Sequence, residues 1–120
     1  MDMLQVRSYS LEGDLEVVAV EGEVDVFTAP RVKDAIDEII GRGARQVAVN
    51  LQGVRYLDST ALSVLVTALR TLRARQGRLL LVSDSPRIQR VLDLTGLSKV
   101  FTICPDEETA RRTAREQPAE

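Results

Sequence analysis

Short apolar segments alternate with longer segments of helical periodicity along most of this chain, and this alternation restricts the possible folds more than any other feature. The segments "RQVAVNL" (45–51) and "RLLLV" (78–82) are almost continuously apolar, which is typical of strands buried on both faces. Strands separated by helices are joined by right-handed crossovers and lie parallel in one sheet. The pattern therefore predicts an α/β fold with a mixed, mostly parallel β-sheet.

The N-terminal part differs, because its two strand-like segments are joined by only a short turn at 12–14. A turn this short favours a hairpin, so we expect the first strand to be antiparallel to the second. The segment 22–30 is expected to be a loop leading to the first helix. The predicted strands are 3–9, 15–21, 45–51, 78–82 and 100–103, and the four predicted helices lie between Thr28 and Gly41, from about Thr60 to Gln76, between Ser85 and Gly96, and over 105–115.

The length of 120 residues is that of one domain. We expect a single domain over 1–120, with its core at about 3–115 and a frayed tail at 116–120. A net charge of −2 argues against a nucleic-acid-binding protein, and no apolar run approaches the roughly 18 residues of a membrane span. The N-terminus also lacks the pattern of a secretion signal, so we expect a cytoplasmic protein with no membrane contact.

The chain contains no His and one Cys, Cys104. Without His, no imidazole can activate a Ser or Cys nucleophile. One thiol provides neither a disulfide framework nor a thiolate metal site within the chain, and the sequence contains no glycine-rich phosphate loop. We therefore expect no enzymatic activity, no catalytic residues, no bound metal and no cofactor.

The stretch "LDSTAL" (57–62) places Asp58, Ser59 and Thr60 at a strand-to-helix junction. One interpretation is structural, because either Asp58 or Ser59 can cap the helix by accepting a free backbone N–H bond. The other is functional, because one cap is sufficient and a Ser at a helix N-terminus lies in a field that favours anions. A phosphate added there would leave the fold intact and disturb a partner docked on the same surface. Both interpretations remain open from spacing alone.

The helix after this junction carries a second apolar line beside its core-facing stripe. Ala61, Val64 and Ala68 form this line, next to Ser63 and Thr67. The line either packs against a neighbouring helix or forms a docking surface for another protein.

Three motifs in sequence order resemble one protein family. They are "GEVDVFTAP" (22–30), "VNLQGVRYLDSTAL" (49–62) and "RIQRVLDLTGLSKVF" (87–101). Together they resemble the anti-sigma factor antagonists, which are the stand-alone bacterial form of the STAS domain. The resemblance covers roughly residues 3 to 115 and implies a single STAS-like domain.

The resemblance also implies a function in transcription regulation by partner switching, as in bacterial stress responses. The unphosphorylated protein would bind an anti-sigma factor that is also a serine kinase, with ATP bound by that partner, and would thereby free the sigma factor. Phosphorylation of Ser59 would abolish binding, and a PPM-type serine phosphatase would restore it. The resemblance favours a monomer that forms hetero-complexes.

Residue by residue, the resemblance assigns Ser59 as the phosphoacceptor, with Asp58 and Thr60 beside it in the motif. Glu23 and Asp25 correspond to an acidic loop that meets the kinase. This chain has Ala61 where the family usually has Gly; the added methyl either narrows the approach of the kinase or adapts the surface to a particular partner. The expected partner-binding residues are Glu23, Asp25, Asp58, Thr60, Ala61, Ser63 and Val64.

Two other functions are considered. A STAS domain can also be a scaffold subunit of a multi-protein stress-signalling assembly. An enzyme that uses Ser59 as its nucleophile would need a base, and with no His the candidates are Lys33 and Lys99, both distant from Ser59 in sequence.

Overall fold

The structure, a computed structural model, describes residues 4–12 and 14–116 and contains one five-stranded sheet in the order β1-β2-β3-β4-β5. Strand β1 is antiparallel to β2, and the remaining neighbours are parallel. This arrangement confirms the predicted α/β fold class. The strands are β1 (Leu4–Leu11), β2 (Leu15–Val24), β3 (Gln46–Leu57), β4 (Arg78–Val82) and β5 (Thr102–Cys104), and the helices are α1 (Ala29–Gly41), α2 (Ser59–Ala74), α3 (Pro86–Leu94), α4 (Glu107–Glu116) and a short 3₁₀ helix, η1 (Leu97–Lys99).

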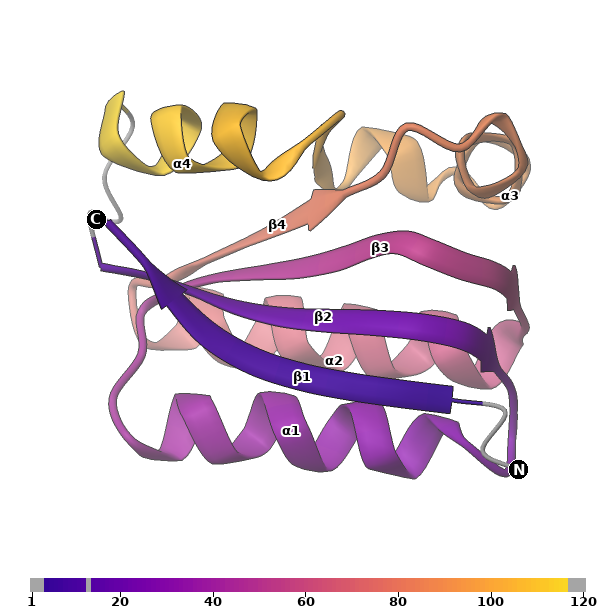
Figure 1. The fold of residues 1–120 in the computed structure, drawn as a ribbon, viewed down its shortest axis with the longest axis horizontal. Helices are drawn as coiled ribbons and strands as arrows, with labels where there is room; N and C mark the ends of the chain where they lie inside the picture. Colours follow the sequence, from indigo (N-terminus) through magenta and orange to yellow (C-terminus); the bar gives the residue numbers. More distant parts are fainter. Residues whose placement is uncertain (1–3, 13, 117–120) are drawn as a thin grey trace.

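The sheet separates two apolar cores. Helices α1 and α2 lie along one face and α4 lies on the other (Figure 1). Successive residues of a strand point to opposite faces, so Val18 and Val20 of β2 join the larger core with α1 and α2, whereas Val17 joins the smaller core under α4. The continuous apolar runs of the sequence therefore correspond to strands that are buried on both faces.

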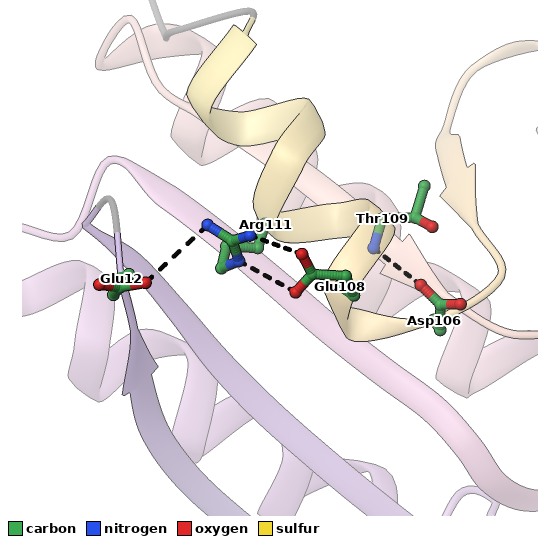
Figure 2. Close-up of polar contacts among 5 residues, drawn as sticks. All are labelled: Glu12, Asp106, Glu108, Thr109 and Arg111. Carbon is green, nitrogen blue, oxygen red and sulfur yellow. Dashed lines mark hydrogen bonds and ion pairs between the residues drawn. The ribbon is translucent and has the colours of Figure 1, made fainter.

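Polar contacts stabilise α4 and connect it to the end of β1. Arg111 donates two hydrogen bonds to the carboxylate of Glu108, at 3.1 and 2.5 Å, and its guanidinium lies 4.0 Å from the carboxylate of Glu12 at the end of β1 (Figure 2). At the start of the helix, Asp106 accepts a hydrogen bond of 2.7 Å from the Thr109 N–H. The contact between Arg111 and Glu12 connects the last helix to the end of β1, whereas the other two contacts lie within α4 and at its start.

The Glu107 carboxylate forms the centre of a second network beneath α4. It accepts hydrogen bonds from the Tyr9 hydroxyl and from Asn50 Nδ2, the latter at 2.6 Å. Burial, together with the nearby Glu107 carboxylate, raises the pKa of Tyr9 to about 12. Tyr9 is on β1 and Asn50 is on β3, so one carboxylate ties the helix to two strands of the sheet.

The ends of β2 and β3 differ from the sequence prediction. Residues 22–24 were expected in a loop, but β2 continues to Val24, and β3 continues to Leu57 instead of ending at residue 51. Register shifts occur between these strands near Glu21 and Gly22, and Gly22 has a φ of 112° that favours glycine. The irregular pairing interrupts the apolar alternation, so the sequence pattern resembles a loop.

Smaller differences concern single boundaries. Helix α2 is Ser59–Ala74, not Thr60–Gln76, and β5 is Thr102–Cys104, not 100–103. The predicted turn at 12–14 includes Gly13 and the predicted tail includes 117–120, which lie outside the described residues. The predicted first strand likewise begins at Met3, outside the described residues, and the observed β1 ends at Leu11.

In the part of the chain that the structure describes, no helix has both the length and the apolar character needed to cross a membrane.

Candidate functional site

The candidate site lies at the edge of the sheet where β2 and β3 end and where α1 and α2 begin, on the right of Figure 1. The last paired residues of the two strands are Val24 and Leu57. Immediately after them, the Asp58 N–H donates a hydrogen bond of 3.2 Å to the Val24 carbonyl. The two motifs "GEVD" and "LDST", distant in sequence, therefore meet in space because their strands are neighbours.

Of the two residues that could cap α2, the N-cap is Asp58. Its backbone is extended, with φ −105° and ψ −175°, and its Oδ1 accepts a hydrogen bond of 3.0 Å from the Ala61 N–H. Ser59 is the first residue of the helix and is exposed, and within the described residues its hydroxyl has no hydrogen-bond partner. The cap function thus belongs to Asp58, and Ser59 presents a free hydroxyl to solvent.

Asp25 shapes the loop between β2 and α1. Its Oδ1 accepts hydrogen bonds from the N–H groups of Phe27, at 2.9 Å, and Thr28, at 3.0 Å. Hydrogen bonds from the Thr28 N–H and then the Phe27 N–H hold the pKa of Asp25 below its usual value. The carboxylate therefore stays charged and is occupied within its own turn.

Thr28 completes this turn from the other side. It occupies the predicted N-cap position of α1, but its side chain forms no cap bond to the helix. Its Oγ1 instead donates to the Glu23 carbonyl, at 2.8 Å, and accepts from the Asp25 N–H, at 2.9 Å. The loop is thus fixed by side-chain bonds at both of its ends.

This turn leaves apolar side chains exposed at the tip of the loop, a feature that the sequence analysis missed. Phe27 is 86% exposed and Val26 is 56% exposed. On the neighbouring strand, Tyr56 is 50% exposed. The signal that would have found them is "DVFT", in which Asp25 and Thr28 form a local turn that directs the two residues between them outward.

Further along α2, several predicted residues line a shallow groove against α1. Thr60, Ser63 and Val64 lie on its α2 side, and Lys33 and Asp37 lie on its α1 side, around a volume of about 150 Å³. Lys33 Nζ is 2.5 Å from an Asp37 carboxylate oxygen, and this contact raises the pKa of Lys33. A lysine held protonated in this way is a poor general base.

Ala61 differs from the other predicted partner-binding residues. Its side chain is only 2% exposed and packs in the larger core. A buried methyl cannot narrow the approach of a protein to the surface, so this expectation for Ala61 does not fit the structure. The exposed or half-buried members of the predicted set are Glu23, Asp25, Asp58, Ser59, Thr60, Ser63 and Val64.

The sequence model of the STAS domain family matches residues 9–110, most of the chain. The chain belongs to the STAS domain family. A relative named anti-sigma-B factor antagonist, from Listeria monocytogenes, is 40% identical over 86 residues, which are 72% of this STAS protein and 75% of the relative. A relative of the same name from Staphylococcus aureus is 35% identical over 86 residues, which are 72% of this STAS protein and 80% of that relative.

Solved structures agree with this membership. An anti-sigma factor antagonist from Mycobacterium paratuberculosis superposes with a TM-score of 0.85 at 28% identity, covering 93% of this STAS protein and 94% of that chain. The phosphorylated form of the Bacillus cell fate determinant SpoIIAA superposes with a TM-score of 0.71 at 23% identity, covering 91% and 99%. The second likeness shows a shared fold.

Proposed function

We propose that this STAS protein is an anti-sigma factor antagonist whose binding to an anti-sigma factor is controlled by phosphorylation of Ser59. The observation that carries the proposal is the exposed Ser59 hydroxyl, which has no hydrogen-bond partner within the described residues and lies on the first turn of α2 beside the ends of β2 and β3. The names of the relatives from Listeria and Staphylococcus support the same role. The protein would act in the cytoplasm, where sigma factors join RNA polymerase.

The modification itself requires little of this chain. The anti-sigma factor, acting as a serine kinase, would bind ATP and supply the base. The Ser59 oxygen would attack the γ-phosphorus, forming one O–P bond while the bond to ADP breaks, and the hydroxyl proton would pass to the kinase. A PPM-type serine phosphatase would later hydrolyse the phosphoserine with water.

The position of Ser59 explains why phosphorylation would change binding more than folding. A phosphoserine carries about −1.5 to −2 charge, and a helix N-terminus favours negative charge through its free N–H groups. The same dianion inside a tight interface would lose its water and meet the carboxylates of the adjacent loop. The fold would therefore tolerate phosphate, and the complex would dissociate.

The proposed binding surface surrounds Ser59. Glu23, Asp25 and Asp58 lie at the ends of β2 and β3, and Thr60, Ser63 and Val64 line the groove between α1 and α2. Ala61 contributes to the core and is left out of this surface.

The decisive test is phosphate incorporation by the host's anti-sigma factor kinase with labelled ATP, followed by peptide mapping. We expect about one phosphate per chain in the wild type, none in Ser59→Ala, and wild-type incorporation in Ser8→Ala, which changes an exposed serine on β1 that is not part of the proposed binding surface. The Ser59→Glu variant should melt at nearly the wild-type temperature while binding the anti-sigma factor at least tenfold more weakly. Full incorporation in Ser59→Ala would assign the phosphate to another hydroxyl. Undiminished binding by Ser59→Glu would favour the scaffold function.

A further inference from the structure

The loop between β2 and α1 presents an aromatic side chain to solvent in a fixed position. Phe27 is the most exposed of the large apolar residues that the structure describes, at 86%. Single exposed apolar residues are common on protein surfaces and need no special explanation. Phe27 is distinguished by the way its loop is held and by the place where it lies.

The loop is ordered before any partner arrives. Asp25 Oδ1 accepts the backbone N–H groups of Phe27 and Thr28, and Thr28 Oγ1 donates to the Glu23 carbonyl. The backbone carbonyl of Asp25 also accepts the Ala29 N–H at 2.8 Å, so the turn continues directly into α1. Binding through a pre-ordered loop avoids much of the entropy that ordering a flexible loop would lose.

The loop also borders the phosphorylation site. It follows Val24, whose carbonyl accepts the Asp58 N–H, and Asp58 caps the helix that begins with Ser59. Tyr56, a second half-exposed aromatic residue, is paired with Glu23 across the two strands. The exposed Phe27 and Tyr56 thus belong to segments that meet at the same end of the sheet as Ser59.

We propose that Phe27 is the main apolar anchor of the partner-binding surface and inserts into an apolar pocket of the anti-sigma factor. This inference rests on the proposed function and adds the chemistry of the contact. Binding energy at protein interfaces concentrates in a few buried aromatic residues surrounded by a polar rim. Phe27 supplies the aromatic residue, and Glu23 and Ser59 supply the rim. Attachment through Phe27 is independent of the charge on Ser59, so anchor and switch are separate parts of one surface.

The geometry gives Asp25 a positioning function within this surface. Its carboxylate bonds to the backbone of the loop that carries Phe27, so it acts on the partner through Phe27. In this respect the proposal differs from the interpretation of Asp25 as an acidic contact with the kinase.

Calorimetric titration of the unphosphorylated protein with the purified anti-sigma factor tests the anchor. We expect Phe27→Ala to raise Kd by about 30-fold or more, which is the size of a strong interface residue. Phe27→Tyr keeps the ring and should stay within about threefold of the wild type. Val100→Ala is the matched control, because Val100 is exposed and its carbonyl faces Arg73 in the last turn of α2, about 21 Å along the helix from Ser59. The Kd of the Val100→Ala variant should equal that of the wild type.

The outcomes separate this inference from the proposed function. If the wild type binds tightly and the Kd of Phe27→Ala is within twofold of the wild-type Kd, Phe27 is not the anchor. The proposed function is unaffected by that result. A wild-type protein that fails to bind the anti-sigma factor would overturn both. Because Phe27 is exposed, Phe27→Ala should melt within about 1 °C of the wild type, so a loss of binding cannot be attributed to unfolding.

A double-mutant cycle tests the function of Asp25. We expect Asp25→Ala to weaken binding in the wild-type background and to have little further effect in the Phe27→Ala background, because both substitutions remove the same contact. Losses that add fully would show that Asp25 contacts the partner itself and would overturn its positioning function.

Discussion

Ser59 and Ala61 are two residues apart on the first turn of α2, yet their side chains lie in opposite environments. Ser59 is exposed, whereas Ala61 is buried in the larger core and donates its N–H to the Asp58 cap. The motif places Ala61 two residues after Ser59, the predicted phosphoacceptor, so the sequence alone assigned Ala61 to the partner-binding surface. Which residues of a helix face the core depends on how the helix is placed against the sheet, and its first residue helps to set that placement. The sequence left open whether Asp58 or Ser59 precedes the helix, so it did not decide which way Ala61 points.

Replacement of Ala61 by Gly, the usual residue of the family, should therefore change stability and leave phosphorylation almost unchanged. We expect the free energy of unfolding to fall by about 1–2 kcal/mol, because the helix loses a good helix former and the core loses a methyl group. Urea unfolding measures this change, and the initial rate of phosphate incorporation at Ser59 should stay within twofold. Ser63→Gly, at an exposed position of the same helix, gives the effect of Gly without the loss of a buried methyl. A much faster phosphorylation of Ala61→Gly would mean that the methyl does restrict the kinase.

At the level of elements, the sequence predicted the order of strands and helices and the direction of β1, because apolar periodicity and short turns are local signals. It did not predict the length of β2 and β3. Gly53 illustrates the reason: a Cβ at this position would lie 2.6 Å from the Glu21 Cγ, so the strand needs glycine where the sequence suggests a loop. Glu23, Asp25 and Ser59, which the sequence predicted as one site, lie at the same end of the sheet. The exposed Phe27 was missed, since its exposure depends on hydrogen bonds within the loop that apolar periodicity does not reveal.

The C-terminal ends of α1 and α2 show how two elements stabilise each other. Arg75, after α2, donates a hydrogen bond of 3.2 Å to the Ile40 carbonyl at the end of α1. Arg45, after α1, donates one of 2.9 Å to the Gln76 carbonyl beyond α2. Both arginines thus place a positive charge at the negative C-terminal end of a helix, which is a favourable arrangement.

We predict that Arg75→Ala lowers the free energy of unfolding by about 1 kcal/mol, since the α1 terminus loses a charged hydrogen-bond donor. Because salt screens such interactions, the difference from wild type should shrink in 1 M salt. Urea unfolding at low and high salt measures both effects. Arg70→Ala is the matched control, because Arg70 is an exposed arginine of α2 with no hydrogen bond or ion pair in the part of the chain that is described. An equal, salt-independent loss in both variants would contradict the proposed contact.

For the whole molecule, the sheet keeps two sets of interactions apart. The candidate site lies where β2 and β3 lead into α1 and α2, whereas α4 covers the opposite face and is held by the network around Glu107 (Figure 1). The Tyr9 hydroxyl and Asn50 both donate hydrogen bonds to the Glu107 carboxylate beneath α4. These bonds link β1, β3 and α4. A substitution in this network should therefore alter the attachment of α4 without altering phosphorylation at Ser59.

The ionisation of Tyr9 reports whether α4 is attached in solution. The folded protein holds the Tyr9 proton more tightly than the unfolded chain, with a pKa of about 12 against the ordinary value of 10. The contribution of the Tyr9 proton to the free energy of unfolding is complete below pH 10 and is lost as the pH rises through 12. The chain has two Tyr residues, so Tyr56→Phe leaves Tyr9 as the only phenol for ultraviolet titration. We expect its midpoint near 12, and a lower midpoint after Glu107→Gln, which removes the nearby negative charge. The Glu107→Gln variant should incorporate phosphate at Ser59 at the wild-type rate. A midpoint near 10 in the Tyr56→Phe variant with Glu107 intact would mean that α4 does not cover Tyr9 in solution.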